Sequence, residues 1–134
     1  MEANKIIITG AATRMGAAIA KKLSGPGVEM VVHYNSSKKE AEKLQKELVK
    51  NKTKVYLVKA DLAKEQDLKK IIKFSKSKLK YFNCLINNAS LFENDSLKNF
   101  SSKSWNQHLD VNLKAPAYLT KEFAKNTRGK NNNI

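Results

Sequence analysis

A glycine-containing turn near the start of the chain has the composition of a phosphate-binding site. It is Thr9-Gly10-Ala11-Ala12-Thr13-Arg14-Met15-Gly16, and it joins a β-branched run at residues 5–8 to a segment with helical spacing. The first N–H groups of a helix are unpaired and partially positive, so they attract phosphate. Gly10 lets a ligand approach the backbone, and Gly16 lets the helix lie close to the strand. The turn therefore predicts a nucleotide site, although a purely structural β-α turn has the same residues.

A second feature is an asparagine that lies four residues before a proline. Asn112 and Pro116 both fall within a predicted helix. Proline has no N–H to donate to the carbonyl four residues earlier, so the Asn112 carbonyl is free to bind a water molecule. A kink that relieves a packing conflict would use the same proline. The pattern thus indicates a water site or a kink.

Strands and helices alternate along the chain, which predicts an α/β fold with a parallel, doubly wound sheet. The expected strands are residues 5–8, 29–33, 54–60 and 82–87. The first helix places Met15, Ile19 and Leu23 on one apolar face. Three more helices are expected from about 37 to 50, from about 64, and from 101 to about 126. Residues 131–134 look like the start of a fifth strand, so we expect a Rossmann-type sheet that is truncated there.

The composition predicts one domain and no membrane-spanning segment. The chain has 134 residues and a net charge of +14, with a mean hydropathy of −0.54, which is enough for one core. Arg14 and Arg128 are the only arginines and no aromatic residues separate the lysines, so we expect solvated helix faces rather than specific nucleic-acid binding. The N-terminus leads directly into the first strand and leaves no room for a signal peptide, which predicts a cytoplasmic protein.

The cysteine and the two histidines do not indicate a metal site. Cys84 is the single cysteine and lies in a predicted strand, so a buried thiol is expected. His33 and His108 have no partners at ligand spacing. His108 is expected to be a helix-surface residue.

Together these motifs resemble the short-chain dehydrogenase/reductase superfamily. The glycine turn is followed in the family's order by Asp61-Leu62, Asn87-Asn88-Ala89-Ser90 and Asp110-Val111-Asn112, and the resemblance spans residues 5 to about 134. Arg14 stands where the turn usually has its middle glycine. This departure, together with Ser90-Leu91-Phe92, resembles the pteridine-reductase branch. The resemblance implies a Rossmann-type domain over residues 1–134 that is incomplete at its C-terminus.

The end of the second predicted strand bears on the choice of cofactor. In dinucleotide-binding sheets an acidic residue at this place binds the ribose 2′-hydroxyl and repels a 2′-phosphate. This chain has no acid between His33 and Lys38. The segment offers polar side chains instead, and with Arg14 it favours NADP(H) over NAD(H). A polar loop with a capping serine has the same composition.

The resemblance also implies roles for residues after the third and fourth strands. Asp61 is expected to accept a hydrogen bond from the adenine amino group, although an aspartate also suits a helix N-terminus. The expected cofactor-binding residues are Gly10, Arg14, Met15, Gly16, Tyr34, Asn35, Ser36, Ser37, Asp61, Leu62, Asn88, Ala89 and Ser90. The expected substrate-binding residues are Arg14, Ser90 and Phe92, where Phe92 stacks on a pterin ring or caps the core. Asn112 is expected to hold the water of a proton relay.

The family's catalytic serine and Tyr-x-x-x-Lys pair are missing from their expected place. Tyr34 and Lys38 match the pair by spacing, but they follow the second strand, where the adenosine end of the cofactor binds. We therefore expect the N-terminal, cofactor-binding part of an NADPH-dependent reductase of C=N or C=O groups, inactive alone. A 3-oxoacyl or sugar-type ketoreductase and a non-catalytic nucleotide-binding or interaction module remain alternatives. The apolar face of the last helix predicts a homo-oligomer.

Overall fold

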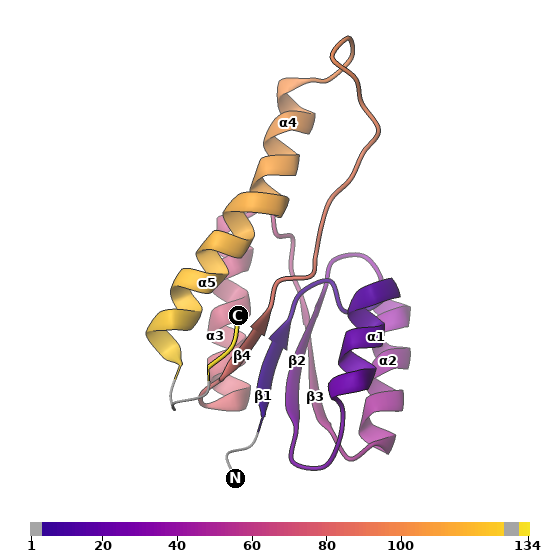
Figure 1. The fold of residues 1–134 in the computed structure, drawn as a ribbon, viewed down its shortest axis with the longest axis vertical. Helices are drawn as coiled ribbons and strands as arrows, with labels where there is room; N and C mark the ends of the chain where they lie inside the picture. The colour runs from indigo at the N-terminus through magenta and orange to yellow at the C-terminus, as the bar shows by residue number, and fades with distance from the viewer. Residues whose placement is uncertain (1–3, 128–131) are drawn as a thin grey trace.

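Four parallel strands form the centre of the computed structural model, which describes residues 4–127 and 132–134 (Figure 1). The strands are ordered β3-β2-β1-β4. Their bounds are Lys5–Ile8 for β1, Glu29–Tyr34 for β2, Lys54–Lys59 for β3 and Cys84–Ile86 for β4. All the pairings are parallel. The expected parallel, doubly wound α/β fold is confirmed.

Helices cover both faces of this sheet, so the strands are buried on both sides. Helices α1 (Arg14–Leu23) and α2 (Lys38–Lys50) pack on one face, against Ile6 and Ile8 of β1. Helices α3 (Glu65–Leu79) and α5 (Ala115–Asn126) pack on the other face, against Ile7. The inward side chains predicted for the third helix are all buried; they are Leu68, Ile71, Ile72, Ser75 and Leu79.

The predicted apolar face of the first helix is wrong at two of its three residues, while Ile19 packs against the core as expected. Met15 is 71% exposed and Leu23 is 40% exposed. The buried residues of α1 are Gly16 and Ala20. The helix lies so close to the sheet that only small residues fit there: a Cβ on Gly16 would come within 2.3 Å of the Gly10 carbonyl oxygen. Close packing at this turn therefore overrides the hydrophobic periodicity.

The last helical region is interrupted by a turn of π-helix. It consists of α4 (Ser102–Leu109), the π-helical η1 (Asp110–Lys114) and α5, which follow one another as a single rod in Figure 1. Ser101 caps α4 as expected, since its Oγ accepts the Ser104 N–H at 3.1 Å. The Ala115 N–H bonds to the Asp110 carbonyl, five residues back. Pro116 directly follows and lacks the N–H that an α-helical turn would need, which accounts for the irregular turn at this place.

Residues near the end of the chain form backbone hydrogen bonds with the outer edge of β4. The Leu85 N–H donates to the Asn133 carbonyl at 2.9 Å, and the Asn133 N–H donates to the Asn83 carbonyl at 3.0 Å. The predicted start of a fifth strand agrees with this parallel bridge, while Asn131 lies outside the described residues. Cys84 is half-buried beside this edge, and burial raises the pKa of its thiol.

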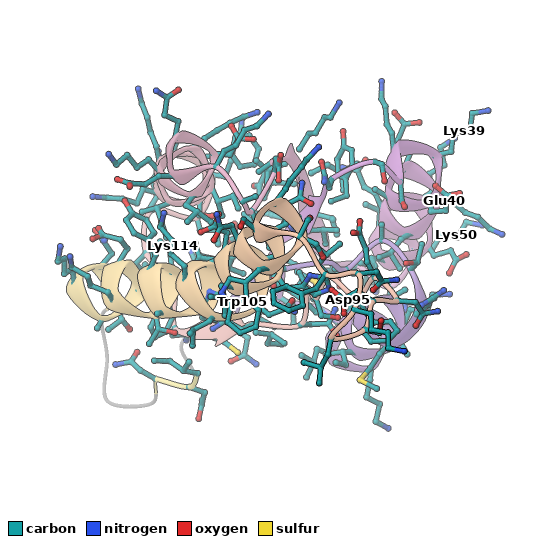
Figure 2. All side chains as sticks on the ribbon, turned by 90° about the horizontal axis from the view of Figure 1, so that it is seen from above. Lys39, Glu40, Lys50, Asp95, Trp105 and Lys114 are labelled. Atoms are coloured by element: carbon teal, nitrogen blue, oxygen red, sulfur yellow. The ribbon has the colours of Figure 1, made fainter. Side chains whose placement is uncertain are left out.

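The charged side chains lie mainly on the outer helices. Figure 2 looks onto the end of the molecule to which the strands point, and Lys39, Glu40 and Lys50 of α2 point away from the body in that view. None of the helices in the described part of the chain is long and apolar enough to cross a membrane.

Replacing Gly16 by alanine tests the close contact of α1 with the sheet. Alanine normally stabilises a helix relative to glycine by about 1 kcal/mol. Here its Cβ would meet the Gly10 oxygen and, at 2.5 Å, the Asn88 Nδ2 atom, so we expect Gly16→Ala to lower the free energy of unfolding by about 2 to 3 kcal/mol. Urea unfolding measures this. Gly25→Ala is the control, because a Cβ there has no neighbour within 4 Å; equal stability of the two variants would contradict the contact.

Candidate nucleotide-binding site

A cavity of about 680 Å³ lies at the carboxyl ends of the strands. It is lined by most of the residues predicted to bind the cofactor: Gly10, Arg14, Met15, Gly16, Asn35, Ser37, Asp61, Leu62, Asn88, Ala89 and Ser90. Tyr34 and Ser36 do not line it. Four further lining residues were not predicted: Thr13, His33, Leu91 and Val111. The turn after β1 and the loops after β2, β3 and β4 thus meet around one space, as in other doubly wound sheets.

The glycine turn leaves the N-terminus of α1 open toward this cavity. Gly10 has a φ of +60°, and a Cβ on it would lie 2.7 Å from the Ala89 Cα. The Thr13 side chain does not cap α1, and the first turn of the helix contains no acidic residue. Uncapped N–H groups without a nearby carboxylate are suited to bind an anion. The geometry therefore fits a phosphate group at this turn.

Arg14 adopts a left-handed backbone conformation, with a φ of +50°. Glycine adopts this conformation without strain, whereas a residue with a Cβ is disfavoured there by about 1 kcal/mol. The structure therefore shows a physical reason for the glycine that the family pattern has at this position. In this chain Arg14 occupies this position and lines the cavity.

Thr9 and Asn88 fasten the glycine turn to the end of β4. The Thr9 Oγ accepts the N–H groups of Asn88 and Ala89, both at 3.1 Å. The Asn88 Nδ2 group donates to the Thr9 and Gly10 carbonyls, both at 3.0 Å. Because both side-chain donors of Asn88 are used in this way, its role in the structure is to hold the turn in place.

His33 connects the glycine turn to β3, a role that the sequence did not indicate. Its side chain is 2% exposed. The Gly10 N–H donates to its Nδ1 at 3.0 Å, so the ring proton is on Nε2, which donates to the Ala60 carbonyl at 2.9 Å. Burial lowers the pKa of His33, and this outweighs the opposite influence of the Ala60 carbonyl and of the Asp67 and Asp61 carboxylates.

The Asp61 side chain is partly engaged by its own loop. Its Oδ1 accepts the Ala63 N–H at 3.1 Å, and Lys64 Nζ lies 3.6 Å from its Oδ2. The Asp61 N–H donates to Asp67 at 2.6 Å. These contacts fit the interpretation of Asp61 as a residue that orders the start of α3. The expected contact with adenine stays a prediction.

At the other end of the cavity, Asn112 holds the segment after β4 through its side chain. The Leu91 N–H donates to the Asn112 Oδ1 at 2.7 Å, and the Asn112 Nδ2 donates to the Leu91 carbonyl at 2.8 Å. The side-chain amide is therefore occupied, and the backbone carbonyl is the group of Asn112 that remains suited to hold water. Leu91 and Val111 line the cavity here.

Phe92 lies outside the cavity. Its side chain is 82% exposed and does not contact the core, so the alternative that Phe92 caps the core is wrong. The segment is extended, so neighbouring side chains point in opposite directions. Leu91 faces the cavity and Phe92 faces outward. Stacking of Phe92 on a substrate stays a prediction.

Comparison with known proteins identifies the family. The sequence profile described as short chain dehydrogenase matches residues 4–134. The chain therefore belongs to the short-chain dehydrogenase family, as the motifs predicted. It is similar to the 3-oxoacyl-[acyl-carrier-protein] reductase FabG of Staphylococcus epidermidis, with 30% identity over 108 residues, which are 81% of this chain and 44% of that protein. The chain spans about half the length of the relatives that it matches.

Two solved structures illustrate the likeness. The FolM alternative dihydrofolate reductase 1 from Brucella canis, complexed with NADP, is 28% identical, has a TM-score of 0.85, and is matched over 95% of this chain and 51% of that one. A short-chain dehydrogenase from Burkholderia cenocepacia in complex with NADP has a TM-score of 0.89 at 22% identity, over 94% of this chain and 51% of that one. The second comparison shows the fold alone.

The buried, neutral His33 predicts a pH-dependent stability. Its pKa is lowered in the folded state, so the unfolded chain binds a proton first, near the ordinary pKa of about 6.5. The stabilisation that depends on His33 is therefore complete above about pH 6.5. It is lost as the pH falls through the pKa of His33 in the folded state, which lies below that value. Urea unfolding between about pH 7.5 and about pH 5.5 measures this slope.

The control variants separate His33 from the rest of the chain. His33→Asn retains an acceptor for the Gly10 N–H but does not titrate in this range, so we expect its stability to depend less on pH. Asn106→Ala changes an exposed, non-titrating residue of α4 and should keep the slope of the unaltered protein. A slope that is unchanged in His33→Asn would contradict the assignment.

Proposed function

We propose that this chain is the cofactor-binding part of a longer NADPH-dependent short-chain reductase. The observation that carries the proposal is the convergence, at one cavity, of the uncapped N-terminus of α1 and the acid-free segment after β2. The first suits a pyrophosphate, and the second suits a 2′-phosphate. The similar FolM structure, which is complexed with NADP, supports the same cofactor.

The residues around the cavity fit each part of this cofactor. Gly10 and the first turn of α1 would hold the pyrophosphate, and Arg14, Asn35 and Ser37 would surround the 2′-phosphate. The loop after β3, with Asp61 and Leu62, would hold the adenine. The backbone of residues 88–90 would face the nicotinamide end. When bound, NADPH supplies a hydride to a carbonyl or imine carbon.

The chain's own contribution to proton transfer would come from η1. The side chain of Asn112 is fixed by Leu91, and Pro116 cannot donate to the Asn112 carbonyl. We propose that this carbonyl orders a water molecule on the path by which the reduced product receives its proton. The general acid itself would come from a part of the protein beyond this chain.

A pterin-like substrate is the class that we favour. Arg14, Ser90 and the exposed ring of Phe92 are the residues that would bind it, and the likeness to a structure named alternative dihydrofolate reductase supports the choice. The likeness to FabG proteins favours a 3-oxoacyl reductase as the second candidate. A nucleotide-binding module without catalysis would use the same cavity. Measurements of activity on pterin and 3-oxoacyl substrates therefore have to separate these three functions.

The exposed apolar face of α4 and η1 supports a homo-oligomer. Trp105, Leu109 and Leu113 are all exposed, and α4 extends away from the sheet in Figure 1. Exposed apolar patches of this kind mark interaction surfaces. We propose that copies of the protein associate through residues 101–126, in the cytoplasm, as the sequence analysis expected.

Arg14→Gly should weaken NADPH binding without lowering the stability of the fold. Glycine relieves the left-handed backbone at φ +50°, so we expect stability to be unchanged or raised by up to about 1 kcal/mol. Loss of the guanidinium should weaken NADPH binding by roughly tenfold and leave NADH binding within about twofold. Fluorescence titrations with both cofactors measure this. Arg14→Lys, which keeps a cation, is the control; an unaltered protein that prefers NADH would refute the cofactor assignment.

The 134-residue chain alone should not transfer hydride to a carbonyl or pterin substrate. Tyr34 is the last residue of β2, at the proposed adenosine side, and does not line the cavity, so we do not expect it to act as the general acid. NADPH oxidation, followed by absorbance with biopterin or acetoacetyl-coenzyme A, measures the activity of the purified chain. Turnover that disappears in Tyr34→Phe and persists in Tyr118→Phe would show that the Tyr34 and Lys38 pair is catalytic after all.

A further inference from the structure

Three side chains on one face of the last helical region hold an extended segment after β4. Ser104, His108 and Asn112 are each four residues apart, and their partners Asp95, Glu93 and Leu91 are each two residues apart. The Ser104 Oγ donates to the Asp95 carboxylate at 3.1 Å. The Glu93 N–H donates to His108 Nε2 at 3.0 Å, and Asn112 bonds to both backbone groups of Leu91.

This pairing follows from the dimensions of the two structures. Four residues of helix advance about 6 Å, and two residues of extended chain advance about 6.6 Å. Each turn of the helix therefore meets every second residue of the segment, which runs in the opposite direction. Figure 1 shows the chain rising from the end of β4 and then turning back into α4. Residues 91–95 are called the paired segment below.

His108 is the central member of this arrangement, and its protonation state follows from its partners. The Glu93 N–H can only donate, so Nε2 carries no proton and the ring proton is on Nδ1. Nδ1 donates to the Ser104 carbonyl at 2.8 Å, within α4. The ring is thus anchored to its own helix and accepts one bond from the segment. His108 is therefore half-buried and bonded at both nitrogens, and the expectation of an ordinary helix-surface residue is wrong.

The alternation of the paired segment determines what faces outward. The N–H and C=O groups of Leu91 and the N–H of Glu93 bond to side chains of the helix, whereas the N–H and C=O groups of Phe92 and Asn94 have no partner within the described residues. The Phe92 ring is exposed, and the Leu91 side chain lines the cavity. A slip of the pairing by one residue would turn the Leu91 side chain away from the cavity wall.

We propose that His108 is a positioning residue for the substrate end of the cavity. By accepting the Glu93 N–H it sets the rotation of the paired segment, and so keeps Leu91 on the cavity wall. This role rests on the proposed function only in that the cavity beside Leu91 then receives the substrate. His108 itself does not line the cavity.

The test compares three variants of the whole chain. His108→Leu removes both ring nitrogens, His108→Gln places an amide oxygen near the position of Nε2, and Asn106→Ala changes an exposed residue of the same helix. NMR hydrogen exchange of the Glu93 amide is the direct measurement. We expect exchange about tenfold faster in His108→Leu, near the original rate in His108→Gln, and unchanged in Asn106→Ala. The Leu91 amide, which Asn112 holds, should stay protected in all of them.

Two binding measurements connect this position to function. NADPH affinity should stay within about twofold in every variant, because the glycine turn is untouched. Binding of biopterin in the presence of NADPH should weaken about fivefold in His108→Leu and recover in His108→Gln.

The outcomes separate this proposal from the proposed function. Equal Glu93 exchange in His108→Leu and the unaltered chain, or no recovery in His108→Gln, would overturn the positioning role. Absence of NADPH binding to the unaltered chain would overturn the proposed function and leave the Glu93 result to decide on His108. If biopterin does not bind, the pterin class is wrong, and the shift of the Leu91 methyl signals between His108→Leu and His108→Gln replaces it as the second measurement.

Discussion

The contact between the glycine turn and the end of β4 is the constraint on which the site depends. At Gly10 and Gly16 a Cβ would come within 3 Å of Ala89, Asn88 or the turn's own backbone. The absence of side chains lets α1 start almost against the sheet, with its first N–H groups facing the cavity. Thr9 and Asn88 then satisfy the backbone groups that this approach brings together, since buried polar groups without partners are unfavourable. The turn is therefore held by packing and by hydrogen bonds within the chain.

Both histidines act as neutral acceptors for backbone N–H groups. His33 accepts from Gly10 and His108 accepts from Glu93; the other nitrogen of His33 donates to the Ala60 carbonyl after β3, and that of His108 donates to the Ser104 carbonyl of its own helix. A neutral imidazole has one donor and one acceptor at fixed positions, so it can join two backbone segments that both need a partner. One such ring supports the cofactor end of the cavity, and the other supports the segment at the opposite end.

The sequence was sufficient to predict the fold and most of the residues that line the cavity, because both depend on local patterns. Strand and helix periodicity predicted the order of elements, and the loops after successive parallel strands necessarily meet at one end of the sheet. The errors arise where tertiary contact decides. Met15 is exposed since the helix approaches through Gly16. The roles of His33 and His108 depend on backbone groups 23 and 15 residues away, and such pairs leave no pattern in a single sequence.

The π-helical turn shows how one residue serves two parts of the site. With Pro116 next to η1, the regular ladder of helical hydrogen bonds is interrupted beside Asn112. The side chain of Asn112 fixes Leu91, while Pro116 has no N–H to donate to the Asn112 carbonyl. A residue with an N–H in place of Pro116 would leave the side chain in place and supply the α-helical donor for the carbonyl. The proline is therefore the feature that withholds this donor, while Leu91 beside it on the cavity wall stays fixed.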